Sequence, residues 1–173
     1  MRKKYVILLY VFFILLAAVG VTTMVWSDLK DKSMEQEKYN NYLNYKNSLL
    51  SHEEYISKID EIDINVSVHK SNDTYLVSTN FTNPDNNYKN LIILVVDEKE
   101  LTNKTDKIYP SIGIVGDYNN EFVTSAPNKK TTHSKLTMNY ESEEISSGVL
   151  IYLEYVDNGK KCIVHLNVSA TLI

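Results

Sequence analysis

The sequence predicts a mainly β protein in which an N-terminal transmembrane helix and a helical stalk precede an antiparallel β-sandwich. Three observations carry this prediction. Residues 5–26 contain no charged side chain, residues 27–60 contain neither Gly nor Pro, and from Glu61 onward apolar side chains alternate with polar ones. We therefore expect a basic cytoplasmic tail at 1–4, a transmembrane helix (signal anchor) at 5–26, a stalk at 27–60 and an extracytoplasmic β domain at 61–173.

The uncharged stretch from Tyr5 to Trp26 is long enough to cross a membrane. Its 22 residues would extend about 33 Å as a helix, and the hydrocarbon core of a bilayer is about 30 Å thick. Three basic residues, Arg2, Lys3 and Lys4, precede the stretch. The positive-inside bias therefore predicts a single-pass protein of the cell membrane with its N-terminus in the cytoplasm and its C-terminal domain outside.

A cleaved signal peptide is the alternative interpretation. It also has a basic start and an apolar middle, and Ala18-Val19-Gly20 provides a small-x-small cleavage site. The apolar run continues beyond Gly20 to Trp26, however, whereas a secretory apolar region is usually about 7–15 residues long. The sequence favours the anchor and leaves cleavage open.

The predicted stalk allows two interpretations. Tyr42, Tyr45 and Leu49 have the 3-4 spacing of a coiled-coil seam, which would continue through Ile56 and Ile59 and make the chain a homo-oligomer. In "LSHEEY", by contrast, Ser51 and Glu54 form a capping box. In that case one helix ends near Leu50, and a short second helix runs from His52 to about Asp60 and packs Ile56 and Ile59 on the β domain. We narrowly prefer the second interpretation.

Two hairpins in the β domain have a register that the sequence specifies. Asn158-Gly159 predicts a two-residue type I′ turn, because both central residues of that turn need a positive φ. One face of this hairpin then has only apolar pairs: Tyr155–Cys162, Leu153–Val164, Ile151–Leu166 and Val149–Val168. The other face pairs Val156–Lys161, Glu154–Ile163, Tyr152–His165 and Leu150–Asn167. A turn at Asn72-Asp73 likewise pairs Val68–Val77, Val66–Thr79 and Ile64–Phe81, and a slip by one residue would destroy both patterns.

Further short strands lie between these hairpins. Leu91–Val96 is apolar throughout, which is typical of a central strand covered on both faces. Shorter strands are expected at 111–115, 121–125 and 135–140, separated by turn residues. About eight short strands without a helix pattern suggest a sandwich of immunoglobulin-like architecture, although no cysteine pair supports that family.

Composition excludes several functions. Residues 61–173 carry 15 acidic and 10 basic side chains without a basic stripe, so nucleic acid is not an expected partner. The only cysteine, Cys162, can form no intrachain disulfide and is expected to be a small buried hydrophobe on the core face. We find no catalytic motif and no metal-ligand spacing, and we expect no cofactor.

The sequence therefore predicts a non-enzymatic, membrane-anchored binding or assembly module of the cell envelope, whose partners are the membrane and other envelope proteins. Its candidate interaction surface is the outer face of the C-terminal hairpin, at Leu150, Tyr152 and Ile163. Two alternatives remain: a structural subunit of an envelope-spanning secretion or conjugation apparatus, and a secreted binding factor released by signal-peptide cleavage.

Overall fold

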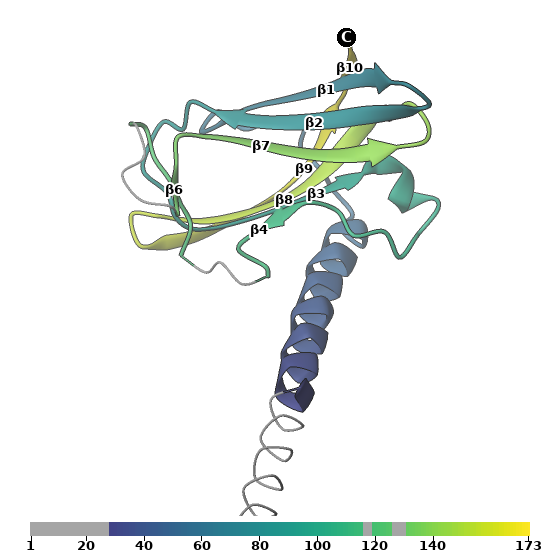
Figure 1. Ribbon diagram of the computed structural model, residues 1–173. Helices are drawn as coiled ribbons and strands as arrows, with labels where there is room; N and C mark the ends of the chain where they lie inside the picture. Colours follow the sequence, from purple (N-terminus) through teal and green to yellow (C-terminus); the bar gives the residue numbers. More distant parts are fainter. Residues whose placement is uncertain (1–27, 116–118, 126–130) are drawn as a thin grey trace, which may run out of the picture. The chain divides into compact units, whose positions relative to one another are not determined.

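A computed structural model describes residues 28–115, 119–125 and 131–173 of the chain (Figure 1). The predicted cytoplasmic tail and transmembrane helix lie outside the described residues. Within the part that is described, every helix is too short or too polar to cross a membrane. The chain divides between Asn40 and Asn41 into two compact units. Residues 41–60, predicted as part of the stalk, therefore belong to the same unit as the β domain.

The larger unit is built mainly from two four-stranded sheets, which face each other in Figure 1. The first sheet has the order β10 (Thr171–Leu172), β1 (Asp63–Ser71), β2 (Thr74–Thr82), β7 (Lys135–Ser142). The second has the order β4 (Ser111–Ile112), β3 (Lys89–Asp97), β8 (Gly148–Asp157), β9 (Lys160–Ser169). A short 3₁₀ helix, η1 (Glu98–Leu101), follows β3, and β5 (Glu121–Phe122) pairs with β6 (Thr132–His133). The prediction of a mainly β protein with antiparallel sheets is confirmed.

Both predicted hairpin registers are confirmed. β8 and β9 pair Tyr155 with Cys162 and Tyr152 with His165, and β1 and β2 pair Val68 with Val77. The turn residues have the positive φ that a type I′ turn requires, with 48° at Asn158 and 83° at Gly159. The expected central strand is also present, because β3 lies between β4 and β8. The strands expected at 111–115 and 121–125 are shorter, with two residues each.

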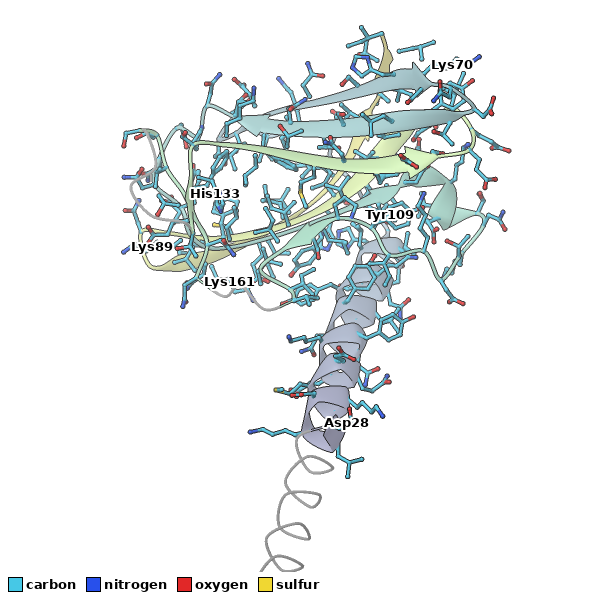
Figure 2. All side chains as sticks on the ribbon, viewed as in Figure 1. Asp28, Lys70, Lys89, Tyr109, His133 and Lys161 are labelled. Carbon is cyan, nitrogen blue, oxygen red and sulfur yellow. The ribbon has the colours of Figure 1, made fainter. Side chains whose placement is uncertain are left out.

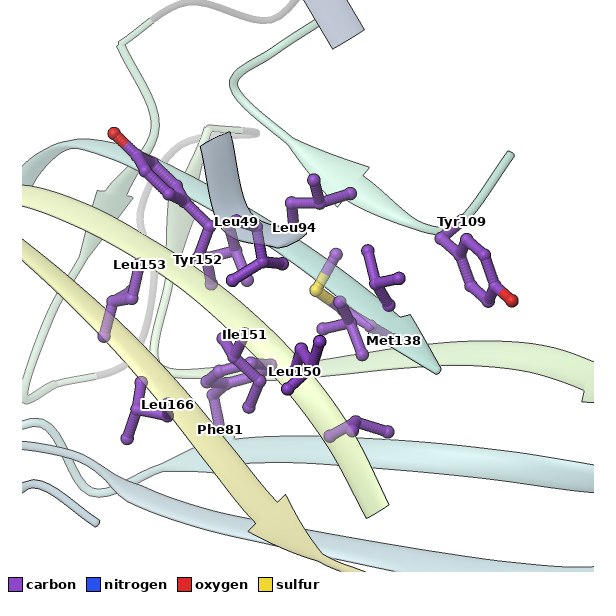
Figure 3. Packing of buried hydrophobic residues seen from close by; sticks show 14 of the residues in the cluster. Leu49, Phe81, Leu94, Tyr109, Met138, Leu150, Ile151, Tyr152, Leu153 and Leu166 are labelled. Atoms are coloured by element: carbon purple, nitrogen blue, oxygen red, sulfur yellow. The ribbon is translucent and has the colours of Figure 1, made fainter. Parts of the chain in front are cut away.

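The core fills the space between the sheets. Ile151 and Leu153 of β8 and Phe81 of β2 are fully buried, and they belong to one cluster of buried apolar side chains (Figure 3). Tyr140 of β7 donates a hydrogen bond from its hydroxyl to Asp97 Oδ2 of β3, at 3.0 Å. Since β7 and β3 belong to different sheets, this bond joins the two sheets across the core.

A helix occupies residues 28–50, and its end at Leu50 agrees with the preferred sequence interpretation. The second helix predicted for 52–60 does not form. Ile56 instead pairs with the edge of β9: its amide donates to the His165 carbonyl at 3.1 Å, and its carbonyl accepts from the Asn167 amide at 2.9 Å. The capping box is absent as well, since Ser51 Oγ donates to the Ser48 carbonyl. Strand pairing at a free sheet edge takes precedence here over the local helix signal.

Candidate functional site

The candidate interaction surface lies on the outer face of the sheet that contains β8 and β9. Leu150 is 0% exposed, Tyr152 is 5% exposed and Ile163 is 49% exposed. The prediction that Leu150 and Tyr152 belong to an exposed surface is therefore wrong. Ile163 alone remains accessible, opposite Glu154 in the β8–β9 register.

The last turns of the helix, with Tyr42, Tyr45 and Leu49, cover this face; we call these turns the cover. The Tyr45 ring meets the Tyr152 ring edge-on, with centroids 5.1 Å apart. Leu49 is fully buried, and Figure 3 shows it with Leu94 and Tyr152 among the packed side chains. Tyr42, Tyr45 and Leu49 were also the basis for a coiled-coil seam. Tyr42 and Leu49 are buried and Tyr45 is partly buried in this unit, which uses the apolar face that such a seam would need.

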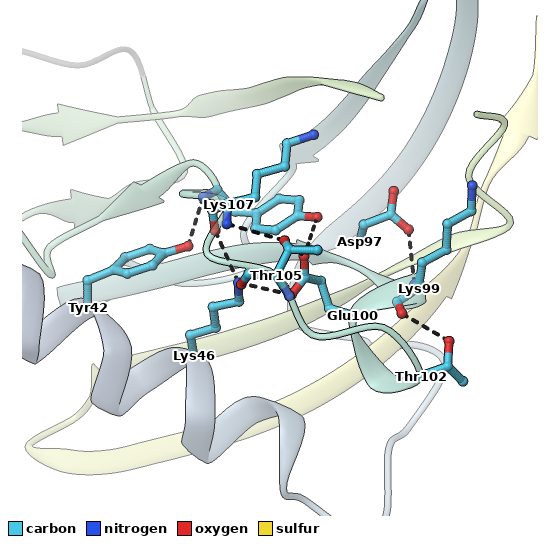
Figure 4. Close-up of polar contacts among 9 residues, drawn as sticks. Tyr42, Lys46, Asp97, Lys99, Glu100, Thr102, Thr105 and Lys107 are labelled. Carbon is cyan, nitrogen blue, oxygen red and sulfur yellow. Dashed lines mark hydrogen bonds and ion pairs between the residues drawn. The ribbon is translucent and has the colours of Figure 1, made fainter. Parts of the chain in front are cut away.

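A buried ion pair lies at the same helix face. Lys46 Nζ is 3.0 Å from Glu100 Oε2, and the two side chains are 5% and 2% exposed. The ammonium group also donates to the carbonyls of Thr105 at 2.7 Å and Lys107 at 3.1 Å (Figure 4). A lysine has three donors, so the charge of Lys46 is fully engaged within the protein.

The carboxylate of Glu100 also has several hydrogen-bond donors around it. Its carboxylate accepts hydrogen bonds from the Thr105 amide at 2.9 Å, from the Thr105 hydroxyl and from the Tyr109 hydroxyl at 3.0 Å. Burial alone would raise the pKa of Glu100, but the hydrogen bonds from Thr105, Lys46 and Tyr109 outweigh it and lower this pKa below its ordinary value. The pair thus joins the helix to η1, and its further hydrogen bonds reach the segment that follows η1.

A group of aromatic side chains surrounds this pair. The Tyr109 amide donates to the Tyr42 hydroxyl at 2.7 Å, and the rings of Tyr109 and Tyr140 meet edge-on at 5.1 Å. Lys107 Nζ stands 5.2 Å from the centroid of each of these two rings, within the range of cation–π attraction. Burial, together with Glu100 in one case and Asp97 in the other, raises the pKa of both tyrosines. They are neutral hydrogen-bond donors, not acids that ionise near neutral pH.

Two histidines meet where the chain leaves the helix. The rings of His52 and His165 are stacked, with centroids 3.7 Å apart and an angle of 19° between their planes. Tyr152 approaches His165 edge-on at 5.3 Å. Burial and the neighbouring His52 lower the pKa of His165. The stack therefore favours a neutral His165 ring, and it lies where the helix that covers this face ends.

Two of the clefts on the described surface contain charged or histidine side chains that already have partners. The larger, about 720 Å³, is lined in part by Lys99, Lys107 and Glu144, and Lys99 Nζ is already paired with Glu144 Oε2 at 2.7 Å. The smaller, about 330 Å³, contains His133, whose Nε2 lies 3.2 Å from Asn120 Oδ1. Burial lowers the pKa of His133. Within residues 28–115, 119–125 and 131–173, no three His, Cys, Asp or Glu side chains are placed to hold a metal ion.

The structure gathers polar residues that the sequence interpretation did not single out. Lys46 lies on the helix face of Tyr42 and Leu49, four residues after one and three before the other, and this position was the available signal. No sequence signal of this kind identifies Glu100. Its partner Lys46 is distant in the sequence, and its partner Tyr109 lies in an irregular segment. Cys162 lies on the core face as predicted, but it is only partly buried.

Comparison of the chain with protein-family models, with curated proteins and with solved structures found no match in any of the three.

Proposed function

We propose that the protein is a non-enzymatic, membrane-anchored module that binds or assembles other envelope proteins through an extracytoplasmic, immunoglobulin-like sandwich. The uncharged stretch 5–26 would be the anchor, and the two-sheet unit would be the part that meets partners. In this proposal the N-terminal stretch attaches the protein to the membrane, and the sheets recognise the partner proteins.

The observation that carries the proposal is the way the helix ends. The helix that follows the apolar stretch does not end in a polar linker, because Tyr42, Lys46 and Leu49 are buried in the two-sheet unit. Burying a lysine is costly unless its charge is fully paired. The end of the helix is therefore part of the two-sheet unit itself, which supports a module attached to the proposed anchor.

The use of the polar groups supports a non-enzymatic role. The buried charges Lys46 and Glu100 bond to each other and to neighbouring groups, and the cleft residues Lys99 and Glu144 form an ion pair. Catalysis needs groups that can exchange protons or bonds with a substrate. Among the described residues, the charged groups discussed above serve internal contacts instead.

Ile163 is the candidate contact for an envelope partner. It is 49% exposed on β9 beside Lys161, which pairs with Glu154 Oε1 at 2.7 Å and is labelled in Figure 2. An exposed apolar side chain flanked by charges on an edge strand is suited to protein contacts. His165, which lies two residues further along the same face, is already covered by His52, so Ile163 is what remains of the predicted surface.

The first test is the intact mass of the natively expressed protein, measured separately in alkaline-washed membranes and in the medium. We expect the full-length mass in the membrane fraction, and protease added to intact cells should digest the two-sheet unit. A mass beginning near Val21 in the medium would contradict the anchor and support a secreted binding factor. Migration in one large, defined complex would favour the apparatus subunit.

The contact itself is tested by cross-linking in cells. Ile163→Asp should reduce the yield of cross-linked envelope neighbours several-fold, because a charge replaces the central apolar contact. Ile145→Asp is a matched control, since Ile145 is also 49% exposed. Equal cross-linking by both variants would remove Ile163 from the proposal without affecting the anchor.

A further inference from the structure

The longest edge strand of the first sheet is β7, and it is open. β7 has eight residues and stands at the end of the order β10-β1-β2-β7. In Figure 1 it runs along the margin of its sheet. Among the described residues, no strand pairs with its outer side. Since an open edge presents unpaired backbone groups, it can accept a further strand.

The hydrogen-bond pattern identifies which residues of β7 face outward. The two-residue turn between β1 and β2 is closed by the hydrogen-bonded pair Ser71–Thr74, so the backbone groups of Thr74 point toward β1. Backbone groups alternate in direction along a strand, so those of Tyr75 and of every second β2 residue after it point toward β7. Their partners in β7 are Ser142, Tyr140, Met138 and Leu136. The odd-numbered residues of β7 therefore direct their amides and carbonyls outward. The Glu141 carbonyl agrees, because it accepts a hydrogen bond from Lys107 Nζ.

These outward residues form a self-complementary series. They are Lys135, Thr137, Asn139 and Glu141, and all four side chains are exposed. If a second β7 lay antiparallel with Met138 opposite Met138 of the second copy, Lys135 would face Glu141 of that copy and Thr137 would face its Asn139. Opposite charges and hydrogen-bonding side chains are the pairs that stabilise neighbouring antiparallel strands. A two-fold arrangement uses each favourable pair twice.

We propose that two copies of this chain associate through antiparallel pairing of their β7 edges, in that register, to form one continuous eight-stranded sheet. The backbone groups of Lys135, Thr137, Asn139 and Glu141 make the new hydrogen bonds. The Glu141 carbonyl can keep Lys107 while it accepts the new amide, because a carbonyl oxygen has two lone pairs. This interface is separate from the helix seam, whose residues Tyr42 and Leu49 are buried within each copy.

The other long edge strand is unsuitable for the same association. Ile56 already occupies the edge of β9 at His165 and Asn167. The part of the β9 edge that stays open begins with Lys160 and Lys161. If a second β9 paired there in antiparallel orientation, centred on these residues, lysines of the two copies would face each other. Lysines on an edge strand are a common protection against self-pairing. A second copy is therefore expected at β7 and not at β9.

Charge reversal tests the register. The full-length protein in detergent is studied by sedimentation equilibrium, and the dimer dissociation constant is measured for the wild type, Lys135→Glu, Glu141→Lys and the double variant. Each single reversal should weaken the dimer about tenfold or more, because it places like charges at both ends of the interface. The double variant restores opposite charges and should return to within about threefold of the wild type.

A second variant tests the backbone pairing. Asn139→Pro removes an outward amide that no strand of the described chain uses, a change that edge strands tolerate. It should keep the circular dichroism spectrum of the wild type but abolish the dimer, whereas Asn139→Ala should keep both. A wild type that stays monomeric at about 100 μM overturns the proposal. So does a dimer whose dissociation constant is unchanged in both single charge reversals.

Discussion

The outer faces of the two sheets differ in a way that explains most of this structure. On the sheet with β3 and β8, the outward residues Leu94, Leu150 and Tyr152 are buried, and the Tyr45 ring of the helix packs on Tyr152. On the sheet with β2 and β7, the outward residues Thr137 and Asn139 are exposed. One sheet is covered on both sides, and the other meets solvent on one.

The strand sequences already differ accordingly. β7 reads KLTMNYES, and its burial alternates residue by residue, as expected when one face is solvated. β8 reads GVLIYLEYVD, and its first eight residues are all buried. A continuous apolar run in a strand therefore indicates a third layer of structure, even where the hairpin register alone suggests an inner and an outer face.

The largest expected effect comes from removing the charge that holds the cover in place. Lys46→Met should lower the free energy of unfolding by about 3–5 kcal/mol, because Glu100 is left buried without its counter-charge. Urea denaturation of the full chain in mild detergent measures this loss. Since the buried side chains carry the cost, the effect should persist at high salt.

The double variant Lys46→Met/Glu100→Gln distinguishes a charge effect from simple loss of packing. It should be more stable than Lys46→Met alone, because no uncompensated charge then remains buried. A double variant that is less stable than the single one would mean that Lys46 contributes through its aliphatic chain, and the ion pair would lose its assigned role.

The next effect compares one substitution on the two outer faces. Leu150→Ala on the covered face should cost about 3 kcal/mol, within the range for fully buried leucines. Leu76→Ala on the open face should cost about 1 kcal/mol or less, because Leu76 is only partly buried. The two free energies of unfolding are measured side by side. Equal losses would show that the two faces do not differ as the structure indicates.

The hairpins could be predicted from sequence because their information is local. The Asn158-Gly159 turn and the alternation around it restrict β8 and β9 to one register, and that register is present. The same holds for the turn at Asn72 and the central position of β3. Turn geometry and period-2 patterning depend on residues close in the chain, so they can be recognised without knowing the rest of the fold.

The cover and the candidate surface could not be predicted, because they depend on contacts between distant segments. The seam of Tyr42, Tyr45 and Leu49 was recognised as apolar, but a helix pattern does not say whether its partner is another helix or a sheet. Consequently Leu150 and Tyr152 were placed on an exposed surface. The Lys46–Glu100 pair spans 54 positions, and only the folded chain brings it together.

The third prediction concerns the histidine stack at the end of the cover. Burial and His52 lower the pKa of His165 from its ordinary value of 6.5. The folded state favours the neutral imidazole of His165. Its contribution to the stability of the protein is therefore complete above the ordinary pKa, and it is lost as the pH falls through the lowered pKa of the folded state. Between about pH 7.5 and about pH 5.5 the wild type should lose stability. His165→Gln should show a flatter dependence in urea denaturation, and an unchanged slope would contradict the assignment.

The smallest effect is expected on the open face, at the hydrogen bond from Thr137 Oγ1 to Asn80 Oδ1, which is 2.7 Å long and exposed. Thr137→Val removes this bond, but water replaces the lost partner of Asn80 and valine suits a strand at least as well. The free energy of unfolding should therefore change by less than about 0.5 kcal/mol. The measurement belongs at low protein concentration, so that pairing through β7 does not contribute. A loss above about 1.5 kcal/mol would mean that Thr137 is shielded from water, and the contrast between a covered and an open outer face would then fail.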